Sequence, residues 1–274
     1  MNAPRLMHRF MLALVLVVVA AGAHAQPAAT EFKPEVGQAG KDVVWVPTPQ
    51  SMVEKMLDMA RVTPKDFVMD LGSGDGRTVI TAAKRGVHAL GIEFNPNMVE
   101  LSKHNAERAG VTDKAQFMKG DLFEADLSKA TVITMFLLPD INLRLRPKIL
   151  DLKPGTRVVS NSFTMGEWKA DQTANVTENC TTYCTALLWN VPAKVDGAWH
   201  LKDGQLTVKQ EFQMLTGSLS SGGKETPVKG QVRGDRISFS AGNAQYSGRV
   251  NGSSIVDGTV KGGGKEGQWT ATKE

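Results

Sequence analysis

The sequence predicts an α/β fold, a doubly wound parallel sheet with helices on both faces, followed by an all-β antiparallel domain. Three observations predict it. Short apolar segments alternate with amphipathic segments between residues 46 and 193, the order that builds a parallel sheet with crossover helices. A glycine-rich loop joins the first apolar segment to the next amphipathic one. From Lys194 onward no helical period is found, and 15 of the chain's 27 glycines lie there.

The elements expected in residues 46–193 follow one another with clear boundaries. Residues 48–60 carry apolar side chains at helical spacing after a proline that suits a first helical turn. The helix at 95–110 begins with an asparagine cap and a proline and ends on a glycine. Within 139–152, Pro147 predicts a kink or a second helix start. The remaining elements are a helix at 77–86 and apolar strands at 66–72, 87–94, 115–121, 130–138 and 156–163.

Residues 194–274 are expected to form an antiparallel meander that closes into a small barrel or sandwich. The pattern Gly-x-Val-x-Gly-x-x-Ile occurs at 230–237 and again at 248–255. Glycines at turns and apolar residues at alternate positions are typical of antiparallel strands. The expected strands include 205–215, 235–241, 244–250 and 267–273. This domain is either a structural appendage or a binding module for a partner or for the cell wall.

The first 25 residues have the three-part layout of a secretory signal. Arg5 and Arg9 give a basic start, residues 10–21 are an unbroken apolar run, and small residues precede a cut after Ala25. The sequence therefore predicts export to the periplasm, with no membrane span left in the mature chain. A buried N-terminal helix and an uncleaved membrane anchor are the alternatives, although a span needs about 20 apolar residues. A linker is expected at 26–45.

Composition is that of a folded protein and does not predict nucleic-acid binding. Hydrophobic residues make up 41% and charged residues 22% of the 274 residues, which is usual for folded domains. The formal net charge of +4 falls to +2 when the two basic residues of the signal are removed. So small a charge, without a basic block interleaved with aromatic residues, predicts neither a nucleic acid nor a membrane surface as partner.

The loop after the first strand has the chemistry of a nucleotide-cofactor site. Asp70 ends the strand, and the loop consists of Gly72, Ser73, Gly74, Asp75 and Gly76. Glycines let the backbone approach a ligand, and free N–H groups at a helix start favour a polar or anionic group. The third glycine follows the second by only two residues, so the dinucleotide pattern Gly-x-Gly-x-x-Gly is not met. Asp75 and Arg77 could instead only cap and solvate the start of the helix, without contacting a ligand.

Two acidic residues end the next two strands. Glu93 lies 17 residues beyond Gly76, and a carboxylate there can accept both hydroxyl protons of a ribose. Asp121 ends the third strand, where it could accept a hydrogen bond from an adenine amino group. With the glycine loop, these two acids predict an adenosyl cofactor.

Cys180 and Cys184 are the chain's two cysteines. Across a tight turn they could form a disulfide, but along one straight strand they could not, so both states remain open. None of the five histidines lies near enough in sequence to complete a recognisable zinc site, and no metal is expected.

These segments together resemble class I S-adenosylmethionine-dependent methyltransferases, whose seven-strand sheet is Rossmann-like. The resemblance rests on "VMDLGSGDGR", "GIEFNPNMV", "KGDLFEADLS", "ATVITMFLLP" and "LKPGTRVVSNSF", in this order, within residues 46–192. More narrowly, "DLGSGDGR", "GIEFNP", a short "DL" segment and "FLLP" are similar to the lysine methyltransferases that modify mitochondrial inner-membrane proteins, and to their bacterial relatives. The resemblance implies S-adenosyl-L-methionine as cofactor and protein lysine as acceptor.

The resemblance also implies a role for each matching residue. The cofactor would be held by residues at strand ends, in the glycine loop and in an N-terminal segment that closes over it: Thr48, Asp70, Gly72, Ser73, Gly74, Asp75, Gly76, Glu93, Asp121 and Leu122. Gln50 would lie with Thr48 near the mouth of the cofactor site. Asp70 and the glycines would bind its methionine end, Glu93 the ribose, and Asp121 with Leu122 the adenine. The acceptor side would be lined by Phe136, Leu138 and Pro139, of which Phe136 and Leu138 could instead be core residues.

Asp140 and Asn142 are candidate catalytic residues, because they follow the fourth strand at the sheet edge where such folds bind ligands. Asp140 could take the proton of a lysine acceptor, and both residues could instead only cap a helix. Residues 161–172 stand where eukaryotic members have an aromatic- and proline-rich stretch, so the acceptor stays open between protein lysine and a small molecule or lipid. A catalytically retired, exported binding protein is the non-enzyme alternative.

Overall fold

The computed structural model describes residues 32–274 of the chain. The predicted signal at 1–25 and the first part of the predicted linker lie outside the described residues. No helix within the described range has both the length and the apolar character needed to cross a bilayer.

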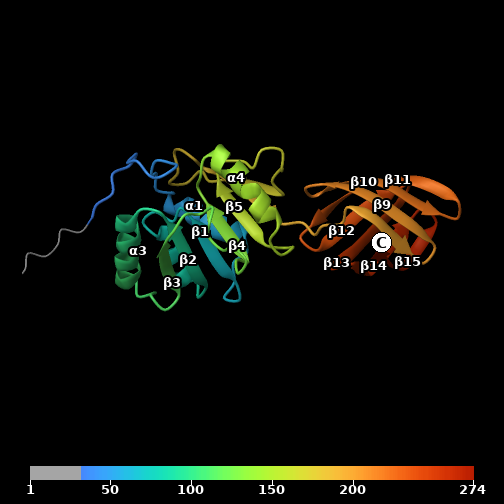
Figure 1. Ribbon diagram of the computed structural model, residues 1–274, viewed down its shortest axis with the longest axis horizontal. Helices are drawn as coiled ribbons and strands as arrows, with labels where there is room; N and C mark the ends of the chain where they lie inside the picture. Colours follow the sequence, from blue (N-terminus) through green and yellow to red (C-terminus); the bar gives the residue numbers. More distant parts are fainter. Residues whose placement is uncertain (1–31) are drawn as a thin grey trace, which may run out of the picture. The chain divides into compact units, whose positions relative to one another are not determined.

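The first part of the described chain is built around one seven-stranded sheet with the order β3-β2-β1-β4-β5-β7-β6 (Figure 1). Its strands are β1 (Phe67–Leu71), β2 (His88–Glu93), β3 (Ala115–Lys119), β4 (Val132–Met135), β5 (Arg157–Asn161), β6 (Gln172–Asn175) and β7 (Thr185–Asn190). The first five are parallel, as predicted. β7 runs antiparallel to β5, and β6 antiparallel to β7. The sequence had not predicted these last two strands.

Helices cover both faces of the sheet. Successive residues of a strand point to opposite faces, and apolar side chains on both faces are buried by packing against helices. The helices are α1 (Gln50–Met59), α2 (Arg77–Lys84), α3 (Pro96–Arg108) and α4 (Pro139–Leu150). On one face, apolar residues of α1, α2 and α3 form a buried cluster with Val68 and Val159. On the other face, α4 packs in a second cluster with Met69 and Val158. The predicted doubly wound arrangement is therefore confirmed.

Helix boundaries follow the expected signals, with one exception. The side chain of Asn95 accepts a hydrogen bond from the Asn97 N–H at 2.9 Å, and Pro96 opens α3. By contrast, α4 continues through Pro147 as one helix, so the second start expected there is not found. Leu145 and Ile149 are buried on either side of the proline, and their packing holds the helix together.

The last part of the chain is a closed eight-stranded antiparallel barrel with the order β10-β11-β12-β13-β14-β15-β8-β9 (Figure 1). Its strands are β8 (Gly197–Leu201), β9 (Gly204–Glu211), β10 (Met214–Ser221), β11 (Lys224–Arg233), β12 (Arg236–Ala241), β13 (Ala244–Asn251), β14 (Ser254–Gly262) and β15 (Lys265–Lys273). β8 pairs with β9 on one side and β15 on the other, which closes the ring. Of the two predicted forms, barrel and sandwich, the structure has the barrel.

One strand prediction in this domain is wrong. Residues 205–215 were expected as a single strand, but they divide into β9 and the start of β10, with a turn at Phe212 and Gln213. Phe212 takes a left-handed backbone conformation with φ 51°. The sequence offers no glycine or asparagine at this turn, so the usual turn signal is missing.

The third loop glycine, Gly76, is required for packing. It caps α2 with φ 82°, and a methyl group added there would lie 2.7 Å from the Phe117 ring and 2.9 Å from the Ser102 Cβ. Gly76→Ala should therefore lower the free energy of unfolding by about 3 kcal/mol, through backbone strain and overpacking. Gly110 has φ 67° with no atom within 4 Å of the added methyl, so Gly110→Ala isolates the strain, about 1 kcal/mol. Urea unfolding of both variants measures the difference, and equal losses would contradict the packing role.

Candidate active site

A pocket opens at the carboxyl ends of β1, β2, β3 and β4 and encloses about 1030 Å³, its open mouth included. In doubly wound sheets this is the edge where ligands bind. Most of its lining comes from the glycine loop, the ends of the strands, and residues 38–48, which we call the strap. Side chains of the helices, among them Met56, Met98 and Ile141, complete it. The strap lies mostly within the stretch that composition predicted as a linker, and sequence reasoning had assigned it no contacts before Thr48.

The glycine loop divides into a part that faces the pocket and a part that faces the core. Gly72 and Gly74 have φ of 74° and 55° and line the pocket, as do Ser73 and Asp75. A methyl group on Gly74 would lie 2.6 Å from the indole Nε1 of Trp45 in the strap. Gly76 is not among the lining residues, so its contact with a cofactor stays a prediction.

Glu93 is fixed at the end of β2 by two backbone groups. The Gly74 N–H donates to its Oε2 at 3.0 Å, and the Asn95 N–H donates to its Oε1 at 2.9 Å. A carboxylate oxygen has two acceptor positions. Each oxygen of Glu93 therefore keeps one position for a further donor, which suits a pair of neighbouring hydroxyl groups.

Asp70 is buried beneath the loop. The Thr134 hydroxyl donates to its Oδ1 at 2.6 Å. Burial raises the pKa of Asp70 to about 7, the nearby carboxylates of Asp75 and Glu93 add to this, and the hydroxyls of Thr134 and Thr78 oppose it. The site thus holds a carboxyl group that titrates near neutral pH.

Asp121 lies at the mouth, bonded to the strap. The Phe123 N–H donates to its Oδ1 at 2.9 Å, and the Lys41 ammonium lies 3.0 Å from its Oδ2. These two contacts hold the pKa of Asp121 below its usual range. Lys41 also lies 5.5 Å from the ring centre of Phe94, which lines the pocket and is 46% exposed. The sequence analysis did not predict Phe94 or Lys41 as site residues. The position of Phe94, an aromatic residue directly after Glu93, could have indicated that it lies at the site.

Asp75 and Arg77 bind each other and the strap. The Arg77 guanidinium donates to both carboxylate oxygens of Asp75, at 2.6 Å for Nη2 and 3.0 Å for Nε. Its Nη1 donates to the Thr48 carbonyl at 2.8 Å. The pair therefore ties the start of α2 to the strap, beyond the capping role considered as an alternative. Gln50 donates to the Thr81 hydroxyl at 3.0 Å and lies outside the pocket lining, whereas Thr48 and Leu122 belong to it.

The predicted acceptor and catalytic residues are only partly brought together. Phe136 lines the pocket, whereas Leu138, Pro139 and Asp140 are exposed at the start of α4 and are not lining residues. Asn142 is fully buried and donates to the carbonyls of Phe163 and Thr164, at 3.3 and 3.2 Å. Neither predicted catalytic residue therefore contributes to the pocket wall. Residues 32–274 hold no group of three His, Cys, Asp or Glu side chains arranged for a metal ion.

The pocket's donors and acceptors fit an adenosyl cofactor. Glu93 has free acceptor positions for ribose hydroxyls, and Phe94 offers an exposed ring on which a base can stack. The hydroxyl of Ser73 is buried without a hydrogen-bond partner among the described residues, and it lines the same pocket. A buried polar atom without a partner costs stability, and a bound ligand can supply the missing bond.

Comparisons with known proteins point in the same direction. The sequence profile of the ANTKMT methyltransferase domain matches residues 70–172. A protein-lysine N-methyltransferase of Saccharolobus islandicus (strain REY15A) is 46% identical over 147 residues, 52% of this chain and 91% of that protein. The adenine nucleotide translocase lysine N-methyltransferase of Mus musculus is 36% identical over 129 residues, 46% of this chain. Those residues are 56% of the mouse protein, so this chain spans little more than half the length of that relative.

One solved structure shares both sequence and fold. It is an RNA methyltransferase from Salinibacter ruber in complex with S-adenosyl-L-homocysteine, at 45% sequence identity and a TM-score of 0.52. The match covers 55% of this chain and 96% of that one. Nearly the whole of this relative is therefore matched, and it binds the demethylated form of the cofactor that this pocket fits.

Proposed function

Because the chain belongs to the protein-lysine N-methyltransferase family of class I S-adenosylmethionine-dependent methyltransferases, we propose that it methylates a lysine side chain of a protein substrate. The observation that carries the lysine assignment is the Saccharolobus relative, of which 91% is matched at 46% identity. The pocket supports methyl transfer, since an adenosyl-binding loop and an apolar wall at Phe136 share one cavity.

The residues of the pocket would hold the cofactor by its separate parts. When bound, S-adenosyl-L-methionine would supply a methyl group activated by a positive sulfur. The acceptor nitrogen would bond to the methyl carbon in line with the breaking carbon–sulfur bond, and S-adenosyl-L-homocysteine would be the leaving group. Glu93 would accept from the ribose hydroxyls, and Asp121 with Phe94 would hold the adenine. Asp70 and the loop glycines would hold the methionine end. Fixing donor and acceptor in line can contribute roughly 7–11 kcal/mol to lowering the barrier.

A lysine acceptor must lose its proton before it can attack. Its usual pKa is about 10.4, and an apolar environment lowers it because burial disfavours the charged form. Phe136 and Leu137 supply such an environment at the end of β4. Asp140, exposed in the first turn of α4, stays a predicted proton acceptor for this step.

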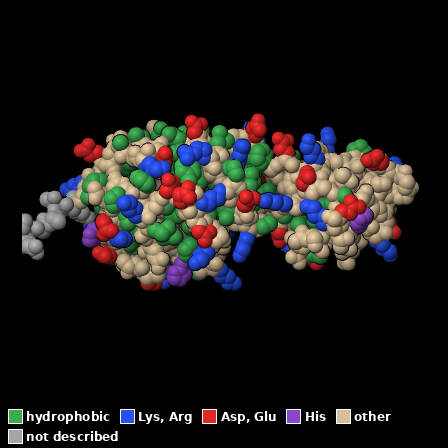
Figure 2. Space-filling model, viewed as in Figure 1, with side chains coloured by type: hydrophobic (Ala, Val, Ile, Leu, Met, Phe, Trp, Pro, Cys, Tyr) green, Lys and Arg blue, Asp and Glu red, His purple; other side chains and the backbone are tan. Residues whose placement is uncertain are grey.

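RNA is the second candidate acceptor, because the Salinibacter relative is an RNA methyltransferase. The surface argues against it. The formal net charge is only +4, and basic and acidic side chains are interspersed on the face shown in Figure 2. RNA-binding proteins usually present a continuous basic surface to the phosphates.

Label transfer distinguishes the acceptors. In parallel reactions, the purified protein and methyl-labelled S-adenosyl-L-methionine are incubated with one of four acceptors. These are a pool of short peptides with one central lysine, the same pool with arginine at that position, total RNA, and an extract of small molecules and lipids. We expect label in the lysine pool alone. Label in RNA alone, or none in the lysine pool, would refute the lysine assignment. Label in a small-molecule or lipid extract alone would assign the acceptor to that class.

We further propose that the enzyme is exported. The proposal rests on the predicted signal and on the disulfide between Cys180 and Cys184, a bond usual in oxidising compartments. Sequencing the N-terminus of the protein from fractionated cells should give Gln26 in an exported fraction. An uncut Met1 in the cytoplasm would contradict export.

A further inference from the structure

Three aromatic rings meet beside the pocket, at the carboxyl ends of β4 and β5 and just before β7. They belong to Phe136, Phe163 and Tyr183, which we call the aromatic cluster. The ring centres lie 5.9 Å apart for Phe136 and Phe163, 5.1 Å for Phe136 and Tyr183, and 5.7 Å for Phe163 and Tyr183. Phe136 also lines the cofactor pocket, so the cluster continues from it.

The backbone around Phe163 is held tightly. Its carbonyl accepts hydrogen bonds from the Ser160 hydroxyl at 2.7 Å and from the buried Asn142 amide at 3.3 Å. The preceding residue, Ser162, has a left-handed backbone conformation with φ 61°. Such conformations cost about 1–3 kcal/mol in residues other than glycine, and they concentrate at functional sites. Asn142, through its bonds to the Phe163 and Thr164 carbonyls, links this loop to α4.

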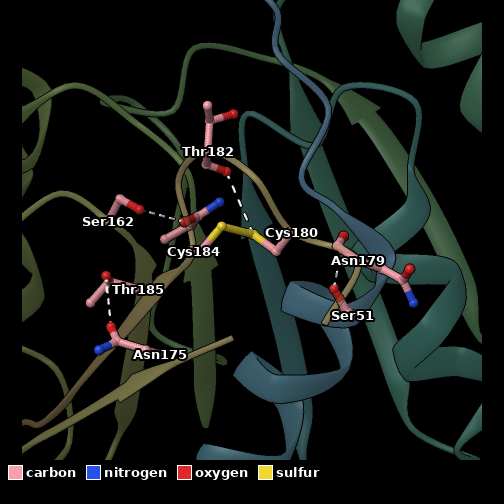
Figure 3. The surroundings of a disulfide bond; sticks show 9 residues. Ser51, Ser162, Asn175, Asn179, Cys180, Thr182, Cys184 and Thr185 are labelled. Atoms are coloured by element: carbon pink, nitrogen blue, oxygen red, sulfur yellow. Dashed lines mark hydrogen bonds between the residues drawn. A yellow bond between two sulfur atoms is a disulfide. The ribbon is translucent and has the colours of Figure 1, made fainter. Parts of the chain in front are cut away.

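Tyr183 is held by a covalent loop. Cys180 and Cys184 form a disulfide, with Cα atoms 5.8 Å apart (Figure 3). Tyr183 belongs to the five-residue segment 180–184 that this bond closes into a ring. Tyr183 has φ 57°, and the Ser51 hydroxyl of α1 donates to the carbonyl of Asn179 at 3.4 Å, beside the ring. The tyrosine is nevertheless 43% exposed. The disulfide and the α1 contact thus constrain the loop that carries Tyr183, and the exposed tyrosine ring lies against Phe136 of the pocket lining.

We propose that the aromatic cluster is the wall along which the acceptor lysine reaches the pocket, and that the disulfide holds Tyr183 in this wall. The inference rests on the proposed lysine methylation. Aromatic rings can pack against the methylene stem of lysine and exclude water from its amine. They also attract a methylated ammonium through cation–π interaction, which suits an acceptor that receives more than one methyl group.

Ordinary core packing does not account for the cluster. Phe136 and Phe163 are only half-buried, and Tyr183 is exposed. A nucleobase could also stack on these rings. A lysine acceptor is favoured over a nucleobase for two reasons. The Saccharolobus relative is a protein-lysine N-methyltransferase, and the chain lacks the large positive charge usual in nucleic-acid-binding proteins.

The test compares acceptor kinetics with cofactor binding in four variants. These are Tyr183→Ala, Tyr183→Phe, the double variant Cys180→Ser with Cys184→Ser, and Thr181→Ala as a control in the same loop. The acceptor is the lysine peptide pool, and calorimetry measures S-adenosyl-L-homocysteine affinity. We expect Tyr183→Ala to lower kcat/KM for the peptides about tenfold, through KM, with unchanged cofactor affinity. Tyr183→Phe and Thr181→Ala should keep wild-type kinetics, and the double cysteine variant should lose about threefold.

The failures of the two proposals are distinguishable. If the wild type methylates the lysine pool and Tyr183→Ala does so equally well, the aromatic wall is refuted while lysine methylation stands. If Tyr183→Ala weakens S-adenosyl-L-homocysteine binding as much as peptide turnover, the role of Tyr183 is structural and the wall is likewise refuted. A wild type that binds S-adenosyl-L-homocysteine but methylates only RNA refutes the lysine acceptor, and the inference with it.

Discussion

Replacing Glu93 with glutamine should weaken the binding of S-adenosyl-L-homocysteine about a thousandfold, or about 4 kcal/mol. The carboxylate accepts from the Gly74 and Asn95 N–H groups and keeps one acceptor position on each oxygen. A glutamine amide has a single acceptor atom, so its NH₂ group would face a backbone N–H or a ribose hydroxyl. Two charge-assisted hydrogen bonds to the ribose would be lost or weakened, each about 1.5–3 kcal/mol.

The matched control is Glu100→Gln. Glu100 is exposed on α3 and forms an ion pair with Lys103, three residues away. Calorimetric titration of S-adenosyl-L-homocysteine should give wild-type affinity for this variant. A loss below tenfold in Glu93→Gln, with the fold intact by circular dichroism, would remove Glu93 from the ribose site.

Replacing Asp70 with asparagine should make the protein without cofactor more stable above neutral pH and change it little near pH 4. The pKa of Asp70 is about 7 in the folded state against 3.8 ordinarily, so between these values the folded state binds the extra proton. Wild-type stability therefore falls as pH rises through this window, by up to about 1.4 kcal/mol per pH unit. Asparagine at this position still accepts from Thr134 and carries no charge.

At pH 8 the free energy of unfolding of Asp70→Asn should exceed that of the wild type by at most roughly 4 kcal/mol. This is an upper value because the site can relax or admit water. Urea unfolding of both proteins at pH 5 and pH 8 measures it. Stability curves that run parallel across this range would mean that Asp70 titrates normally in the folded state. Asp126→Asn is a suitable control, because Asp126 is exposed and its pKa is lowered by Ser128 rather than raised.

The sequence predicted most of the sheet and little of its last two strands. Apolar runs between helix-end signals marked β1, β4 and β5, because these strands are buried along most of their length. β2 and β3 are more exposed, and their place between helix-end signals marked them. β6 reads "QTAN", four residues that are largely exposed, so no apolar pattern marks it. It is a strand because β7 pairs with it, and such pairing is not visible in local composition.

Site residues could be predicted from the sequence where an acidic residue ends a strand, because a carboxylate there can accept hydrogen bonds from a ligand. Glu93 and Asp121 met this condition, and both lie at the pocket. The strap did not, because Lys41 and Trp45 contact residues far along the chain within a stretch that resembles a linker. Of the aromatic cluster only Phe136 was predicted as an acceptor-side residue. Phe163 and Tyr183 were missed for the same reason as the strap, because they come from separate loops far along the chain.

The closure of the barrel limits where copies of this protein can add strands to one another. In a ring, every strand has a hydrogen-bonded neighbour on both sides, so no backbone edge is left to recruit another chain. The described open edges are therefore β3 and β6 of the sheet. Both are short, and β6 is polar, which are features that discourage aggregation through edge pairing. A glycine-rich domain with high strand content thus adds mass to the enzyme without adding an edge for amyloid-like growth.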